Sequence, residues 1–204
     1  METIRGKMSQ NLGLIELSER FKGYNQIALD LGTGDGRFVR CMAEKQPDQF
    51  FIGIDACREN LRVNSRTRLP NALFVIASAQ ALPLELNGLA SQIKINFPWG
   101  SLLKGLLIND CCLLHGLFAI THPCAELEIH LNGEALLTAG WELEAGTDQI
   151  ENNLSAAGWK IKSRSWLDSQ VLRAIPTTWA KRLAFGRDPR AIRLTLQKDE
   201  EKLV

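Results

Sequence analysis

Two short runs of residues have the composition of a ligand-binding site. The run 30–36 (Asp-Leu-Gly-Thr-Gly-Asp-Gly) combines glycines with acids, and the run 96–103 (Asn-Phe-Pro-Trp-Gly-Ser-Leu-Leu) begins where an apolar stretch ends. Glycine has no Cβ, so its backbone approaches a ligand closely. Pro98 stiffens the second run, and the Trp99 indole is placed to stack on a flat group. We expect a nucleotide-like cofactor beside a planar substrate; a tryptophan packed in the core is the alternative for Trp99.

The acids near the glycines favour one class of cofactor. A dinucleotide site has the spacing Gly-x-Gly-x-x-Gly, whereas the glycines here, which include Gly32 and Gly34, stand at every second position. Asp30 would repel a pyrophosphate but attract an ammonium group. Asp55, at the end of the next apolar run, is placed to accept hydrogen bonds from both hydroxyls of a ribose. These residues favour S-adenosylmethionine; a purely structural glycine turn is the alternative.

Two basic clusters point to a nucleic-acid partner. A second tryptophan, Trp179, lies in the irregular stretch 167–190 among the cations Lys181, Arg182, Arg187 and Arg190. An aromatic side chain beside cations on a loop suits stacking on a base next to phosphates. A helix expected over 57–69 adds further arginines, three of them on one face by their four-residue spacing: Arg58, Arg62, Arg66 and Arg68. A solvated basic surface explains each cluster alone, but the two together favour RNA or DNA.

Charge and composition limit the class of protein. The net charge of the 204 residues is +1, but residues 160–198 contain ten basic and two acidic side chains, which fits an anionic partner. No apolar run reaches the roughly 20 residues that span a bilayer, and the first residues lack a signal segment. Five cysteines, an odd number without framework spacing, favour free thiols. We expect a cytoplasmic monomer without membrane contact.

A cluster of cysteines and histidines raises the question of a metal site: Cys111, Cys112, His115, His122 and Cys124. Adjacent cysteines on a helix point about 100° apart, and no Cys-x-x-Cys pair is present. We therefore expect no metal, and interpret these cysteines as buried thiols and the histidines as residues at helix ends.

The elements that position these residues alternate in type. Short apolar runs followed by helical periodicity indicate a mainly parallel, doubly wound α/β sheet. The expected strands span 26–31, 50–55, 73–77, 92–96, 125–131, 160–166 and 191–196, and the expected helices span 37–44, 57–69, 102–118 and 146–157. We expect residues 26–204 to form one domain, with 167–190 linking the last two strands. Residues 1–25 form an expected extension, a hairpin followed by a helix over 14–21.

These residues resemble the 16S ribosomal RNA adenine-N1 methyltransferases of the aminoglycoside-resistance (Kam) type. The runs 30–36 and 98–103, Asp55, and the pair Thr178-Trp179 occur in the order found in that family. The resemblance implies a seven-stranded, class I (Rossmann-like) S-adenosylmethionine-dependent methyltransferase with a mainly parallel sheet and an antiparallel last strand. It also implies methylation of N1 of adenine 1408 in the 30S subunit, and thereby aminoglycoside resistance.

The resemblance also assigns roles to individual residues. It implies cofactor contacts at Asp30, Gly32, Asp55, Ala56, Ala79, Gln80, Asn96, Ser101 and Thr177. It implies that Trp99 and Trp179 enclose the flipped adenine, with 167–190 as a substrate-binding linker. The chain departs from the family in two places: the region 132–158 is shorter, and the basic segment 58–68 uses arginines where lysines are expected.

The implied chemistry suits these residues. N1 of adenine is a neutral lone pair at pH 7, so its methylation needs no general base, and alignment with desolvation suffices. The product ring is cationic, which two indole faces would stabilise. Flipping the base costs a few kcal/mol, and stacking returns about 1–3 kcal/mol per contact. Two tryptophans together therefore offset the cost, whereas one would not.

Three other functions remain open from the sequence. A tRNA guanine-N7 methyltransferase ends the same strand in a similar Asn-Phe-Pro run but continues with Asp-Pro-Trp, whereas Trp99 here follows Pro98 directly. An enzyme that methylates exocyclic amines would use Asn96 as an acceptor, but its motif has a second proline where Phe97 stands. A non-catalytic RNA-binding module would leave the cofactor acids without a role.

Overall fold

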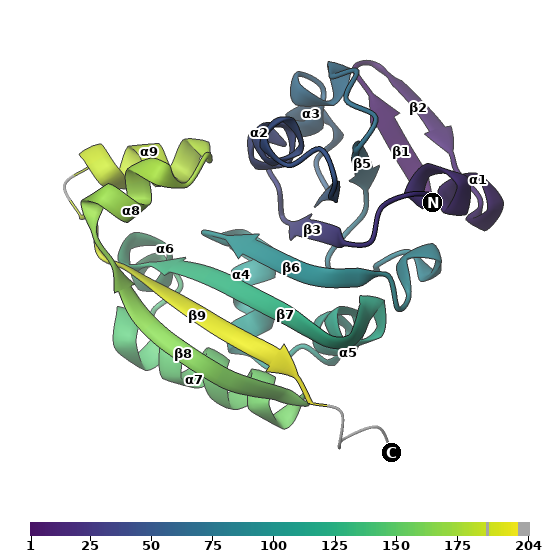
Figure 1. Ribbon diagram of the computed structural model, residues 1–204. Helices are drawn as coiled ribbons and strands as arrows, with labels where there is room; N and C mark the ends of the chain where they lie inside the picture. Colours follow the sequence, from purple (N-terminus) through teal and green to yellow (C-terminus); the bar gives the residue numbers. More distant parts are fainter. Residues whose placement is uncertain (187, 200–204) are drawn as a thin grey trace.

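The computed structural model describes residues 1–186 and 188–199, which form one mixed sheet of nine strands (Figure 1). The spatial order is β2-β1-β5-β4-β3-β6-β7-β9-β8. The strands are β1 (Glu2–Arg5), β2 (Met8–Asn11), β3 (Ile27–Leu31), β4 (Phe50–Asp55), β5 (Ala72–Ile76), β6 (Ala90–Asn96), β7 (Thr121–Asn132), β8 (Trp159–Leu167) and β9 (Ala191–Lys198). The five central strands are parallel, and β1, β2, β8 and β9 pair antiparallel.

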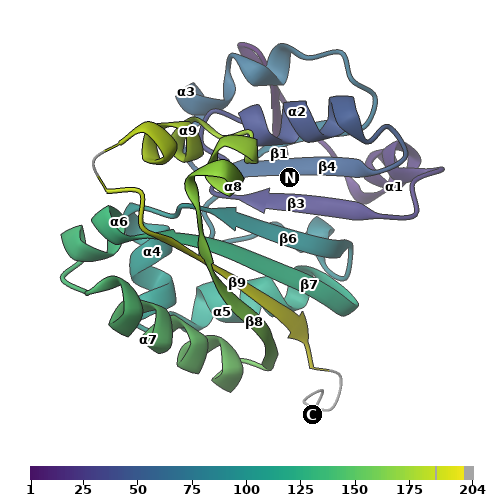
Figure 2. The same ribbon diagram turned by 60° about the vertical axis from the view of Figure 1, so that its left-hand side comes forward.

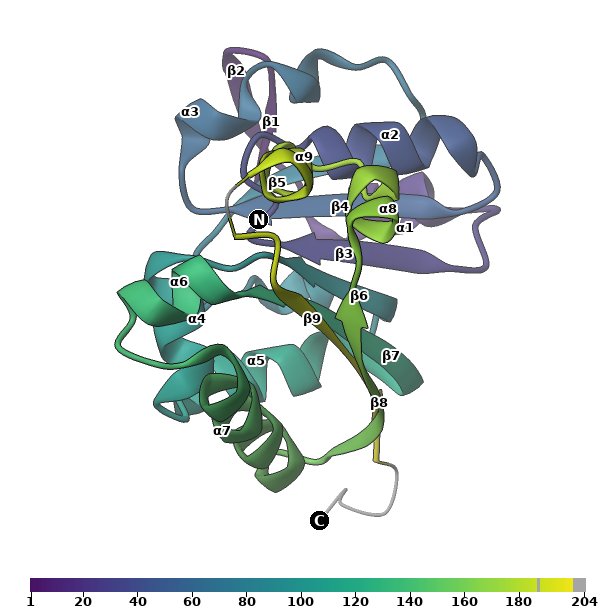
Figure 3. The ribbon, with the colours of Figure 1, turned by 90° about the vertical axis from the view of Figure 1, so that its left-hand side faces the viewer.

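Helices cover both faces of the sheet, which is why the central strands are continuous apolar runs. The helices are α1 (Leu14–Phe21), α2 (Arg37–Lys45), α3 (Arg58–Leu61), α4 (Gly100–Leu107), α5 (Cys111–Ile120), α6 (Gly133–Thr138), α7 (Leu143–Ala156), α8 (Ser169–Ala174) and α9 (Thr178–Phe185). Helices α4, α5 and α7 lie on one face of the sheet, and α2 and α3 lie on the other (Figure 3). Side chains of the first three belong to the larger core cluster, and those of α2 and α3 to a smaller one. Helices α8 and α9 lie beyond the carboxyl ends of β3 and β6 (Figure 2).

The expected number of seven strands is wrong for this chain. The seven core strands are present, and β9 is antiparallel as expected. The N-terminal hairpin adds two more strands, because Thr3 of β1 pairs with Val75 of β5 and so continues the sheet. Helix α1 spans the residues predicted for it.

Three helical predictions need correction. The helix expected over 102–118 is two helices, because Asn109 has a φ of 59° and the Asp110 side chain caps α5 by accepting from Leu113 N. The helix expected over 57–69 is only the four-residue α3 and the short 3₁₀ helix η1 (Asn64–Arg66), so its arginines do not share one helical face. Asn64 and Ser65 are buried and bond to other segments, and these tertiary bonds outweigh local helix propensity.

The third correction concerns 167–190, which is not irregular. Asp168 caps α8 by accepting from Val171 N, and Thr177 caps α9 by accepting from Ala180 N. Capping residues therefore start both helices. As a result Trp179 lies on a helix rather than on a loop.

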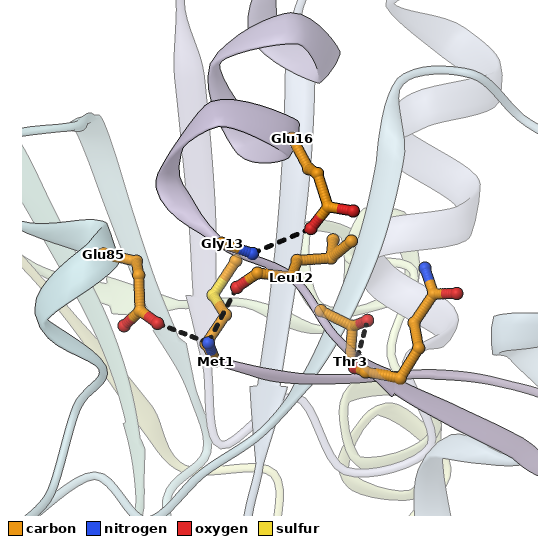
Figure 4. Close-up of polar contacts among 7 residues, drawn as sticks. Met1, Thr3, Leu12, Gly13, Glu16 and Glu85 are labelled. Carbon is orange, nitrogen blue, oxygen red and sulfur yellow. Dashed lines mark hydrogen bonds and ion pairs between the residues drawn. The ribbon is translucent and has the colours of Figure 1, made fainter.

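The N-terminal hairpin is fastened to the rest of the fold (Figure 4). The backbone nitrogen of Met1 donates to the carbonyl of Leu12 at 2.9 Å and contacts the Glu85 carboxylate. Thr3 Oγ1 donates to the carbonyl of Gln10 across the hairpin. The Glu16 side chain accepts from Gly13 N and thereby begins α1.

Within residues 1–186 and 188–199, no single helix is long and apolar enough to cross a membrane. Only α4 and α5 taken together reach that length and apolarity, and they are bent by 96° relative to each other. Cys111, Cys112 and Cys124, predicted to be buried, are exposed. His115 lies in the middle of α5 and His122 in β7, so neither is at a helix end. In the same described ranges no three His, Cys, Asp or Glu side chains converge as metal ligands.

Candidate active site

A cavity of about 640 Å³ lies at the carboxyl ends of β3, β4 and β6, the place where open parallel sheets bind ligands. Most of the predicted site residues line it: Asp30, Gly32, Gly34, Asp55, Ala56, Ala79, Asn96, Trp99, Ser101, Thr177, Trp179 and Arg182. Gln80 is not a lining residue, but its Nε2 donates to the carbonyl of the lining residue Ser101 at 3.1 Å. One connected space therefore holds the acids, the glycines and both tryptophans.

The glycines of the loop after β3 are required at their positions for different structural reasons. Gly32 and Gly36 have φ values of 71° and 73°, and a Cβ on either would lie within 2.6 Å of a side chain. Gly34 has a φ of 58°, and a Cβ there would meet no atom within 4 Å. Its amide donates to Asp55 Oδ2 at 2.9 Å, which fixes the second acid against the loop. The loop thus leaves open space at Gly34 for a ligand.

Asp30 is the buried acid of the site. Thr33 Oγ1 donates to its Oδ2, and Asn96 Nδ2 donates to its Oδ1 at 2.9 Å. Burial raises the pKa of Asp30, and the negative charges of Asp55 and Asp35 raise it further. The two hydrogen bonds lower this pKa, but burial outweighs them, and the result is a pKa of about 7 in place of 3.8. An ammonium group bound next to Asp30 would reverse this effect and favour the carboxylate.

A chain of polar groups leads away from Asp30 through β6 and β7, in which Asn96 and His130 are buried and Lys94 and Glu128 are half-buried. His130 Nδ1 lies 2.9 Å from Asn96 Oδ1, and its Nε2 lies 3.2 Å from Glu128 Oε1. Lys94 Nζ contacts the same Glu128 oxygen at 2.9 Å. Both ring nitrogens of His130 therefore lie next to side-chain oxygens. Burial would raise the pKa of Glu128, but the hydrogen bond from His130 and the charge of Lys94 outweigh it and lower the pKa to about 2.

Sequence reasoning missed this chain of groups. The available signal was the strand 125–131, where the polar residues Glu126, Glu128 and His130 alternate with apolar ones. The register of β6 against β7 places Lys94 beside Glu128 and Asn96 beside His130. Only the register, which the sequence does not specify, connects them to Asp30.

Trp99 and Trp179 meet at the cavity. Their ring centroids are 5.1 Å apart, and their planes are inclined by 26°, so the two indoles stack on each other. The Arg182 guanidinium lies over the Trp179 ring at 5.2 Å. The Nε1 atom of Trp99 is buried and has no hydrogen-bond partner among the described residues. A base between two rings needs planes about 7 Å apart, since each carbon–carbon contact takes about 3.5 Å.

Asp35 joins the glycine loop to both basic segments. Its Oδ2 accepts from Thr178 Oγ1, at the start of α9, at 2.9 Å. Its carbonyl accepts from Asn64 Nδ2, in the segment between β4 and β5, at 2.7 Å. The glycine loop is therefore in direct contact with both segments that were predicted to bind RNA.

The predicted RNA-binding cations differ in their surroundings. Arg58 contacts Glu2 and Ser9, Arg62 pairs with Glu59 at 3.2 Å, and Arg190 binds Asp188 through two nitrogens. Lys181 is exposed, and Arg182 lies over Trp179. Arg66 and Arg68 are exposed, and neither makes an ion pair with a described residue. Arg187 lies outside the described residues.

Comparison with known proteins identifies the family. The family model for NpmA, 16S rRNA (adenine(1408)-N(1))-methyltransferase, matches residues 2–198. A 16S rRNA (adenine(1408)-N(1))-methyltransferase from Escherichia coli is 35% identical, with 92% of this chain and 94% of the relative covered. A tRNA (guanine-N(7)-)-methyltransferase from Brevibacillus brevis is 39% identical, but only 40% of this chain and 41% of the relative are covered.

Solved structures agree with this result. The aminoglycoside resistance methyltransferase NpmB1 has a TM-score of 0.81 and 34% identity, covering 97% of this chain and 98% of its own. A variant of the 16S rRNA (adenine(1408)-N(1))-methyltransferase from Catenulisporales acidiphilia, solved with the cosubstrate SAM, has a TM-score of 0.86. At 24% identity, with 99% of this chain and 98% of that one covered, it shows the shared fold. The chain belongs to the family of 16S rRNA (adenine(1408)-N(1))-methyltransferases.

Proposed function

We propose that this protein transfers the methyl group of S-adenosylmethionine to N1 of adenine 1408 of 16S rRNA within the 30S subunit. The observation that carries this proposal is that Trp99 and Trp179 face each other in the cavity that also contains Asp30 and Asp55. Membership of the family supports both the cofactor and the target. A protein of this function acts in the cytoplasm, where the ribosomes are.

The residues of the cavity fit S-adenosylmethionine. Asp55 is placed for the ribose hydroxyls, Asp30 for the ammonium group, and the open space at Gly34 for the close approach of the ligand. The remaining predicted contacts, at Gly32, Ala56, Ala79, Asn96, Ser101 and Thr177, also line the cavity, and Gln80 supports Ser101 from behind. When bound, the cofactor supplies a methyl group activated by a sulfonium.

The tryptophans act on the adenine. The stacked pair separates to admit the flipped base, and the two ring faces then offset the cost of flipping, about 1–3 kcal/mol for each stacking contact. N1 of adenine carries its own lone pair, so the protein contributes alignment and exclusion of water rather than a general base. The indole faces stabilise the positive charge of the product ring.

The basic side chains hold the RNA around this site. Arg58, Arg62, Arg66 and Arg68 belong to the segment between β4 and β5, and Lys181, Arg182, Arg187 and Arg190 belong to the linker between β8 and β9. Arg58, Arg62 and Arg190 have carboxylate partners in the free protein, and phosphates would compete for them. We propose that one molecule acts alone on one 30S subunit, and that its product confers aminoglycoside resistance.

Primer extension on 30S subunits treated with the protein and S-adenosylmethionine tests this function. A methyl group at N1 blocks base pairing, so reverse transcription stops at adenine 1408. The stop is expected to weaken with Trp99→Ala and with Trp179→Ala when the reaction time is limited, and to keep its strength with Trp166→Ala, a control in which an exposed tryptophan of β8 is removed. An unmodified 30S subunit, together with methylated tRNA, would favour the guanine-N7 reaction instead.

A further inference from the structure

A second cavity, of about 580 Å³, lies on the N-terminal side of the sheet. Its walls are the hairpin β1–β2, helix α1 and residues 65–74. It forms where β1 meets β5 at a single paired position, Thr3 with Val75, so that β1 does not continue along the start of β5. We call it the hairpin groove. Figure 1 shows the hairpin and α1 at the opposite side of the molecule from β8.

Three arginines from three different elements line the hairpin groove: Arg5 of β1, Arg20 of α1 and Arg68 of the segment before β5. All three are exposed, and none makes an ion pair or a side-chain hydrogen bond with a described residue. The neighbouring acids are already engaged: Glu2 with Arg58, Glu16 with Gly13 and Glu19 with Lys22. None of these three carboxylates makes an ion pair with Arg5, Arg20 or Arg68, so the three guanidinium groups are available to an anion.

The walls of the groove are fixed to the segment 58–68. Gly6 N, in the hairpin turn, donates to Ser65 Oγ at 2.9 Å, and Ser65 is buried. The Arg66 side chain packs against the same glycine, where an added Cβ would lie 3.1 Å from its Cγ. The Arg58 guanidinium contacts Glu2 and Ser9. These contacts hold the hairpin against the segment 58–68, so the concave surface is preformed, which reduces the entropy lost on binding.

One segment lines both cavities. Cys57 and Asn60 line the cavity that contains Asp30 and Asp55, and Ser65 and residues 67–70 line the hairpin groove. A single polyanion can therefore occupy both by crossing this segment. Guanidinium groups bind phosphates bidentately, and Thr67, Ser9 and Gln10 add polar groups for ribose or phosphate oxygens.

We propose that the hairpin groove binds the sugar–phosphate backbone of the RNA substrate at a distance from the target adenine, with Arg5, Arg20 and Arg68 on phosphates. This inference rests on the proposed function, because it names a second contact of the same RNA. Its effect is on affinity for the ribosomal particle and not on the cofactor, since the three arginines line only the groove and not the first cavity.

The test is the salt dependence of binding to purified 30S subunits. The groove variant changes all three arginines to glutamine. The control changes Lys160, Lys162 and Arg164 of β8, at the opposite edge of the sheet, to glutamine. Each phosphate contact contributes about 0.7–0.9 to the slope of log affinity against log salt, so the groove variant should lose roughly 2–3 units of slope and the control almost none. A third variant with lysine at the three groove positions should recover most of the slope.

Several results would overturn the inference. The groove variant could bind 30S subunits with the affinity and slope of the unchanged protein, or lose no more than the control does. The unchanged protein could also bind anionic lipid vesicles or an acidic peptide, and the groove variant could lose that binding while it keeps its affinity for 30S subunits. That result would assign the groove to a different anion. Calorimetry with S-adenosylmethionine and the midpoint of thermal unfolding show that each variant is folded. Methylation of 30S subunits by the unchanged protein reports on the proposed function separately, so the two failures are distinguishable.

Discussion

The indole of Trp179 rests on the indole of Trp99, with 5.1 Å between the ring centroids. The pair lies in the separation range of favourable offset stacks, which is worth about 0.5–1.5 kcal/mol beyond burial. The same contact fills the space proposed for the flipped adenine. In the proposed reaction, stacking on the base replaces the contact between the indoles, and the net gain in free energy is the difference between the two.

Loss of either indole should weaken the reaction with RNA. Trp179→Ala removes one base-stacking surface, and at about 1–3 kcal/mol per contact kcat/KM for 30S subunits should fall roughly 5- to 150-fold. Trp179→Phe should retain part of the rate. The affinity for S-adenosylmethionine, measured by calorimetry, should stay close to that of the unchanged protein. Equal kcat/KM values for Trp179→Ala and the control Trp166→Ala would contradict a stacking role.

The stack should also be visible in solution. Two indoles this close couple electronically, so the near-ultraviolet circular dichroism of the free protein should contain a contribution that Trp99→Ala and Trp179→Ala both remove. Binding of a 30S subunit should reduce the same contribution, because a base separates the rings. A signal that persists in either single variant would show that the rings do not stack in solution.

Cofactor affinity should depend on pH through Asp30. With a pKa of about 7, this carboxyl is protonated below neutrality and then offers no charge to an ammonium group. Affinity for S-adenosylmethionine should therefore fall as the pH decreases from 8 to 6. Asp30→Asn should bind more weakly and without this dependence, and calorimetry across that pH range checks both points. An unchanged affinity between pH 8 and pH 6 would rule out this role for the carboxylate.

The same residue should lower the stability of the cofactor-free protein. Asp30 has a higher pKa folded than unfolded, so the folded state binds more protons between pH 4 and 7 and its stability falls as the pH rises through that window. Above pH 7 Asp30 is ionised in both states, and the folded protein is destabilised by the full amount. Asp30→Asn should therefore unfold at a higher temperature than the unchanged protein at pH 8 in the absence of cofactor, and the gain should shrink at pH 5. Scanning calorimetry at the two pH values measures it.

His130 should stabilise the chain of polar groups that connects Asn96 with Glu128. His130→Leu leaves Asn96 Oδ1 without its partner and removes the hydrogen bond to Glu128, at a cost of about 1–3 kcal/mol in the free energy of unfolding. Glu128 has a lowered pKa of about 2, so its contribution is present above pH 4.5 and is lost as the pH falls toward 2. The unchanged protein should lose stability over that window more steeply than Glu128→Gln does. Urea unfolding at pH 7 and pH 3 gives both values.

The sequence predicted the parts of the site that depend on local patterns. Asp30, Asp55 and Asn96 each end an apolar run, and parallel strands bring such ends to one edge of a sheet, so their meeting in one cavity was predictable. The break at Asn109 and the short α3 were not, because both depend on caps and tertiary bonds outside the periodic pattern. His130 was missed because its role depends on strand register.

Asp35 receives hydrogen bonds from Thr178 on one side and Asn64 on the other, next to the loop proposed to hold the cofactor. A bound cofactor that restrains this loop also restrains both segments, so we expect RNA to bind more tightly to the cofactor complex than to the free protein. Thermodynamic linkage makes such an effect mutual, and the ribosomal particle must then slow the escape of the cofactor or speed its capture by the same overall factor. We therefore expect Asp35 to couple the two binding sites, so that bound RNA slows dissociation of S-adenosylmethionine before methyl transfer, and bound cofactor slows dissociation of the RNA.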